Sequence, residues 1–226
     1  MNLGRAFTYA FDDPEAMSKL ALAAALGFVG AITLPLLLAG LAFYAVLLGA
    51  LVALVRNLHD RVPRPLPRWT DWDVKLRQGG AVLTALLVYN LPNLLLGCCA
   101  ALTSSFWSDG VLGNLLLATT LCCALPLLLV YNLLTWPMLA LGLARYADED
   151  NVVAFFQFGD LFAALRRRPG LTLQWLAVMV SVSLFFGLLF AIPCLGWALA
   201  PPLALAVIGY LTAQYAGQVE GHQPGR

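Results

Sequence analysis

The sequence predicts an all-α, polytopic integral membrane protein: a bundle of about six transmembrane helices with one amphipathic interfacial helix. Of its 226 residues, 61% are hydrophobic and only 11% are charged, whereas a soluble globular domain averages about a quarter charged residues. The apolar runs exceed the roughly 20 residues that a helix needs to cross a bilayer, and they lack the alternation of a membrane β-barrel. We therefore treat residues 1–226 as one membrane domain.

The first apolar run extends from Leu20 to Val55 without a charged residue. As one straight helix it would measure about 54 Å against a hydrocarbon core of roughly 30 Å, so one crossing is too few. Pro35 supplies the break, because proline removes a backbone hydrogen bond and disfavours helix at the residue before it. We predict a tight hairpin with spans at about 15–34 and 37–57, and a single crossing is the alternative.

A basic, aromatic and proline-rich stretch follows, which we predict to be a cytoplasmic surface loop over residues 56–78. Its prolines at positions 63–67 favour an extended conformation. Gly79-Gly80 is expected to bend the chain into the next span. The stretch carries the first group of candidate surface residues: Arg64, Arg68, Trp69 and Trp72. Tryptophan beside arginine is typical of an interfacial anchor, and a partner-docking loop is the alternative.

The third span is predicted at about 80–104, and a polar turn separates it from a long apolar run at 111–144. We predict that this run crosses once, tilted and kinked at Pro126 and Pro137. Two crossings would need more residues. They would also move the later arginines to the other side, against the positive-inside bias.

Residues 151–168 are predicted to form an amphipathic helix in the membrane plane. Its apolar surface carries Phe155, Phe156, Phe158, Leu161, Phe162 and Leu165. Its end carries the second group of candidate surface residues: Arg166, Arg167 and Arg168. Each arginine near anionic lipid contributes on the order of 1 kcal/mol, so the triplet is expected to hold the helix end on lipid headgroups.

The last two spans are predicted at about 170–192 and 195–216, followed by a disordered tail from Gly217. With six spans, all thirteen basic residues face one side. The positive-inside rule then places the N- and C-termini in the cytoplasm and the chain in the cell (inner or plasma) membrane.

A recurring pattern links the third and fourth spans. The segment 86–91 recurs with an identical sequence at 128–133, and each copy contains a Tyr-Asn pair nine residues from a Cys-Cys pair. In two antiparallel helices these pairs would lie at matching depths. We predict an interhelical polar layer, with an Asn90–Asn132 or Asn–Tyr hydrogen bond, formed by Tyr89, Asn90, Tyr131 and Asn132. The cysteines are expected to remain thiols that pack between helices.

No motif in the sequence indicates a known chemistry. The sequence lacks His-Glu-x-x-His, Gly-x-Ser-x-Gly and Walker patterns, and no charged residue lies at bilayer depth as ion-coupled transport would require. We expect no catalytic residue, no metal and no cofactor. His59 is interpreted as a solvated loop residue. No continuous basic face exists, so nucleic acid is not an expected partner.

Four pieces of the chain carry a resemblance to a known family. They are Phe7–Pro14, the Leu66-Pro67-x-Trp69-x-Asp71-Trp72 loop with Gly79 after it, the segment 144–158, and Gly209-Tyr210. Together they resemble the prokaryotic DUF4013 family of uncharacterised membrane proteins. The resemblance implies a bacterial or archaeal multi-span protein of unassigned function, and it adds no chemistry.

Two function classes fit these observations. The first is a non-enzymatic scaffold or accessory subunit of a membrane assembly, favoured by the basic, aromatic cytoplasmic surface. The alternative is a transporter or channel for a small neutral or lipid-like solute, which the uncharged polar residues inside the spans would suit. The expected partners are the lipid bilayer, anionic lipid headgroups, and either another membrane protein or further copies of the chain.

Overall fold

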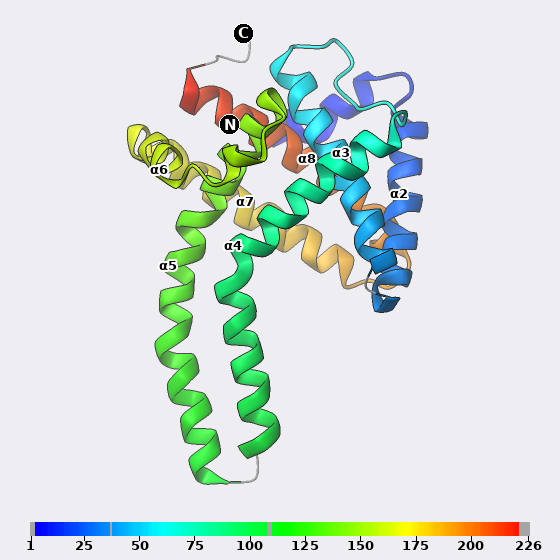
Figure 1. Cartoon of the computed structure of the whole chain (residues 1–226). Coiled ribbons are helices and arrows are strands. Elements are labelled where there is room, and N and C mark those ends of the chain that lie inside the picture. Colours follow the sequence, from blue (N-terminus) through cyan, green and yellow to red (C-terminus); the bar gives the residue numbers. More distant parts are fainter. Residues whose placement is uncertain (1–2, 37, 108–109, 222–226) are drawn as a thin grey trace.

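The computed structural model describes residues 3–36, 38–107 and 110–221, and this part of the chain contains helices and no strands (Figure 1). Six of the described helices are long and apolar enough to cross a membrane. They are α2 (Ala16–Thr33), α3 (Leu38–His59), α4 (Trp72–Trp107), α5 (Val111–Glu149), α7 (Pro169–Phe190) and α8 (Leu195–Glu220). The predicted fold class is therefore confirmed, and the chain is a multi-pass membrane protein.

Five short elements complete the fold. They are α1 (Leu3–Thr8), η1 (Tyr9–Asp12), η2 (Leu34–Leu36), η3 (Val152–Phe155) and α6 (Phe158–Arg167). Helices α2, α3, α7 and α8 pack with the inner halves of α4 and α5 into a bundle, while the outer halves of α4 and α5 extend beyond it as a hairpin (Figure 1). Helix α1, the end of α8, α6 and the connection between α3 and α4 all lie at the opposite end of the bundle.

The closest contact in the bundle is the crossing of α3 and α4. A Cβ atom added to Gly79 would lie 1.5 Å from the backbone oxygen of Ala45, and one added to Gly49 would lie 2.0 Å from the backbone oxygen of Lys75. Small residues let helix backbones approach this closely in membranes. The prediction that Gly79-Gly80 bends the chain is wrong, because both residues lie inside α4 and Gly79 packs on α3.

Several predicted boundaries also move. Helix α3 continues to His59 and α4 begins at Trp72, so the connecting loop is residues 60–71 rather than 56–78. Helix α5 continues through both of its prolines to Glu149, and α8 reaches Glu220. Each of these helices thus runs past its apolar segment. Gly221 follows the end of α8 with a φ of 84°. The rest of the predicted tail, 222–226, lies outside the described residues.

The segment predicted as one interfacial helix is instead η3 followed by α6, and half of its apolar surface faces the protein. Phe155 is fully buried, and Leu161 and Leu165 are buried as well. Gly142 of α5 makes room for the Phe155 ring, since a Cβ at that position would lie 3.0 Å from Phe155 Cδ1. Phe158 at the start of α6 and the arginines at its end remain exposed. Protein packing therefore fixes this segment against α5.

The α4–α5 hairpin changes direction where it leaves the bundle. Helix α4 bends about halfway along its length, and Pro92 lies inside this helix (Figure 1). A proline removes one backbone hydrogen bond and so permits such a bend. Beyond the bend α4 and α5 run antiparallel to each other, away from the other spans.

Substitution of Gly79 tests the α3–α4 contact. We expect Gly79→Ala to lower the free energy of unfolding by at least about 1–3 kcal/mol, because the new methyl group meets backbone atoms that no side-chain rotation can move. Gly80→Ala is the matched control, since nothing lies within 4 Å of a Cβ there. Thermal unfolding of both variants in nanodiscs measures the difference. Equal melting temperatures would contradict the backbone contact.

Candidate functional site

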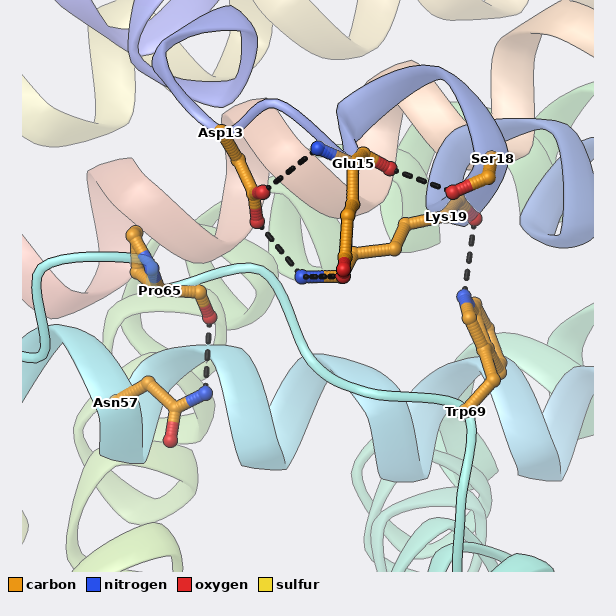
Figure 2. Close-up of polar contacts among 7 residues, drawn as sticks. All are labelled: Asp13, Glu15, Ser18, Lys19, Asn57, Pro65 and Trp69. Atoms are coloured by element: carbon orange, nitrogen blue, oxygen red, sulfur yellow. Dashed lines mark hydrogen bonds and ion pairs between the residues drawn. The ribbon is translucent and has the colours of Figure 1, made fainter.

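Hydrogen bonds hold the loop of residues 60–71 against α3 and against the start of α2 (Figure 2). The Asn57 amide donates to the backbone oxygen of Pro65 at 2.9 Å, and the Trp69 indole N–H donates to the backbone oxygen of Lys19 at 3.0 Å. Trp69 is therefore half-buried and turned toward the protein. Trp72 lies beside it, with ring centroids 5.8 Å apart, and is 43% exposed.

A buried ion pair supports the other side of the same contact. Asp13 is 4% exposed, and its carboxylate accepts hydrogen bonds from Lys19 Nζ at 2.7 Å and from the Glu15 N–H at 2.9 Å (Figure 2). Burial alone raises the pKa of the Asp13 carboxyl, but the hydrogen bonds from Lys19 and Glu15, with the charges of Lys19 and Arg64, outweigh it and hold that pKa below its usual value. The chain thus fixes the start of α2 by charge as well as by packing.

The exposed part of the loop is basic. Arg64 and Arg68 are both exposed and line a polar cavity of about 610 Å³ between the loop, α2 and α3. With Trp72 they form one of the two candidate surfaces. Lys75, which also lines the cavity, is buried and donates to the backbone oxygen of Thr70.

The second candidate surface lies on α6, on the other side of the same end of the molecule (Figure 1). Arg166, Arg167 and Arg168 are exposed, and the Arg166 guanidinium lies 5.9 Å from the centroid of the Phe162 ring. The structure therefore does not bring the two basic groups into one site. They form separate positive patches at the edges of one face.

Ion pairs between helix ends lie between these patches. His59 Nδ1 lies 3.0 Å from Asp148, so His59 ends α3 in a polar contact and is not the solvated loop residue that we predicted. Asp150 accepts from Gln78 at 3.0 Å and from Arg77 at 2.9 Å. The hydrogen bond from Gln78 lowers the pKa of Asp150; burial opposes this, but Arg77 lowers the pKa further.

Tyrosine and asparagine side chains join α4 to α5 near the bend. The Tyr131 O–H donates to the backbone oxygen of Tyr89 at 2.8 Å. Asn93 and Asn132 exchange two amide hydrogen bonds of 3.0 Å. The predicted Asn90–Asn132 bond is replaced by this pair, and Asn90 instead accepts from Asn93 at 3.2 Å. Asn93 was missed because it lies outside the repeated segment, although its spacing of three residues from Asn90 places both on one helix face.

The described cysteines are exposed thiols: Cys98, Cys99, Cys122, Cys123 and Cys194. Within the part of the chain that the structure describes, no group of three or more His, Cys, Asp or Glu side chains is arranged to hold a metal ion. The polar side chains described above either form hydrogen bonds between helices or carry exposed charges.

Comparison with known proteins gives one match. The family model for a protein of unknown function, DUF4013, matches residues 32–195. No curated protein and no solved structure matches the chain. The match covers α3 to α7 and includes the loop, the hairpin and α6.

The buried carboxylate gives a prediction with a pH dependence. We expect Asp13→Asn to lower the free energy of unfolding by about 1–3 kcal/mol at pH 7, because Lys19 loses its buried partner. Since the pKa of Asp13 is lowered in the folded state, its contribution is complete above the ordinary carboxyl pKa of about 4 and is lost as the pH falls through the lowered value.

Thermal unfolding between pH 3 and pH 7 measures this contribution. Asp12→Asn is the matched control, because Asp12 is exposed one residue away. If the two variants unfold alike at pH 7, the ion pair does not stabilise the start of α2.

Proposed function

The chain belongs to the DUF4013 family, and from this membership and the geometry of its hairpin we propose that it is a non-enzymatic scaffold or accessory subunit of a membrane assembly. The observation that carries the proposal is the outer part of the α4–α5 hairpin, residues 93–107 and 110–132, which we call the arm. The arm extends past the other spans (Figure 1).

A bilayer that matches the helices of the bundle is too thin to cover the whole length of the arm as well. Helices α2, α3 and α7 have 18, 22 and 22 residues, or about 27–33 Å, which matches a hydrocarbon core of roughly 30 Å. The uncharged run of α5, residues 111–144, would measure about 51 Å. A tilt of 40°, the upper end of the usual range, would reduce this only to about 39 Å.

The outer surface of the arm is largely apolar, and many of its large side chains are exposed in the monomer. Its exposed large side chains are Leu94, Leu95, Leu102, Leu115, Leu125, Leu127, Leu129 and Val130. If the bundle occupies the bilayer, lipid tails do not cover all of these leucines. An exposed apolar surface of this kind is typical of a protein-binding site. We propose that another integral membrane protein packs against the arm.

The two basic patches have a separate role in this proposal. Arg64, Arg68 and Trp72 on one edge, with the arginines of α6 on the other, would bind anionic lipid headgroups. This fixes the tilt of the bundle, because each patch lies at one edge of the same face. All thirteen basic residues of the sequence would then face the cytoplasm of a prokaryotic cell, as would both termini.

Cysteine labelling tests this orientation. In a background without the natural cysteines, we expect an impermeant maleimide added to intact cells to label Gly110→Cys and to leave Gly4→Cys and Arg167→Cys unlabelled. All three positions are exposed, so the membrane alone decides access. Labelling of Arg167→Cys from outside would invert the proposed topology. Labelling of Gly4→Cys but not of Arg167→Cys would show that the first apolar run crosses the membrane once and does not form a hairpin of two spans.

Site-specific crosslinking tests the arm. A photo-crosslinking amino acid at position 127, where the leucine is 72% exposed, should give one discrete adduct with a different membrane protein in intact cells. Position 188 on α7, where the leucine is 66% exposed, is the matched control and should give lipid adducts only. Leu127→Asn should abolish co-purification of that partner after mild solubilisation, whereas Leu188→Asn should retain it.

Two outcomes would contradict the scaffold proposal. One is the absence of a protein adduct at position 127. The other is an adduct with a second copy of the chain together with a monodisperse homo-oligomer that retains a bound solute, which would favour the transporter or channel.

A further inference from the structure

A cavity of about 380 Å³ lies in the bundle and is lined by residues of α3, α4, α5, α7, α8 and η3. Its volume is within the range of small-molecule sites, about 300–1,000 Å³. Among the described residues of the arm, the cavity touches only Asn132, and it lies apart from the exposed leucines of the arm and from the basic patches. Nothing in the scaffold proposal requires it. Its wall is mainly aliphatic and aromatic, with a few polar side chains among them.

Trp175 of α7 is the most informative residue of this wall. Its side chain is 2% exposed and is stacked on Tyr215, with ring centroids 4.9 Å apart. Its buried indole N–H has no acceptor among the described residues. The nearby hydroxyl of Tyr215 is already paired with Thr172 at 3.0 Å. A buried donor without an acceptor is destabilising, so a ligand oxygen at this place would satisfy it.

The lining residues also determine which ligand charge the cavity can accommodate. None of the described residues that line the cavity is charged, while Asn90, Asn132, Thr135 and Ser183 contribute amides and hydroxyls. A charged group here would have no counter-ion at bilayer depth, which is costly. The cavity therefore suits a neutral head group that can accept hydrogen bonds.

A second cavity, of about 450 Å³, lies beside the first, between α3, α7 and α8. Leu48, Leu51 and Ile208 line both cavities, so the two are neighbours across these side chains. The lining of the second cavity is almost entirely apolar and reaches Phe190 at the end of α7. Along α7, the two cavities together extend from Trp175 to Phe190. This distance is about 22 Å, which is longer than one leaflet of a hydrocarbon core of roughly 30 Å.

We propose that the two cavities form one binding site for a neutral, single-chain amphiphile. A hydroxyl or carbonyl oxygen of its head group accepts the hydrogen bond of Trp175, and its hydrocarbon chain fills the second cavity. The polar end and the apolar end of the site determine the orientation of the ligand. The apolar cavity of about 450 Å³ would hold the one hydrocarbon chain of such a ligand.

Native mass spectrometry of the purified full-length protein tests the site, with 1-monooleoylglycerol as the probe. We expect saturable binding of one molecule per protein. Oleoyl-lysophosphatidylglycerol has the same single chain but an anionic head group, and it should bind at least tenfold more weakly. Comparable binding of the two probes, or the addition of many copies without saturation, would identify ordinary surface lipid and overturn the proposal.

Two variants examine the two ends of the site. Trp175→Phe keeps the ring stacking but removes the N–H, and should weaken binding of the probe about 3- to 10-fold, the loss expected for one net hydrogen bond. Trp197→Phe, on α8, is the matched control, because Trp197 lines neither cavity; it should bind as the unmodified protein does. Equal affinities of these two variants would overturn the role of Trp175.

Ala204→Phe should block the second cavity, because Ala204 lines it. We expect this variant to lose monooleoylglycerol while its melting temperature without ligand stays unchanged. Retained binding would overturn the placement of the chain, even if Trp175→Phe fails to fold. Neither result depends on crosslinking at the arm, so failure of this site and failure of the scaffold proposal are distinguishable.

Discussion

The backbone contact between α3 and α4 at Gly49 and Gly79 determines the arrangement of the other spans. In a bilayer the lipid tails are as apolar as leucine, so helices associate through close packing rather than through the hydrophobic effect. The two glycines give α3 and α4 the closest approach in the bundle. Because α4 crosses α3 there, it leaves the bundle at an angle, and the later bend sends its outer half away from the other helices (Figure 1).

The same crossing explains why the loop between these helices is ordered by side chains. A chain that must pass from His59 to Trp72 across the start of α2 exposes many backbone groups in a short distance. Asn57 donates to one of these groups, the backbone oxygen of Pro65. The Trp69 indole joins the loop to the backbone oxygen of Lys19 in α2, and Asp13 holds the Lys19 side chain. The basic residues that remain exposed are thus displayed on a fixed support. A flexible loop with the same composition would not hold them at one edge.

The sequence was sufficient for the number and order of the spans, since charge-free runs and the basic-residue pattern depend only on composition and length. It was insufficient wherever a contact between distant residues decides the outcome. Gly79-Gly80 looked like a bend, because glycine has a low helix propensity and the packing partner of Gly79 lies on another helix, α3. Phe155 looked like a lipid-facing residue, because the space at Gly142 is visible only in three dimensions. Trp175 gave no signal, since an unpaired N–H is a property of the folded state.

The hydrogen bonds among Asn90, Asn93 and Asn132 lie at the boundary between the bundle and the arm. Asn90 and Asn132 line the inner cavity, whereas Asn93 begins the arm. Amide pairs of this kind hold two membrane helices together without other neighbours. The arm can therefore extend from the bundle as a two-helix unit. A ligand in the cavity and a partner on the arm would contact the same helix pair on the two sides of one polar layer, so the layer that stabilises the hairpin also separates its two proposed binding surfaces.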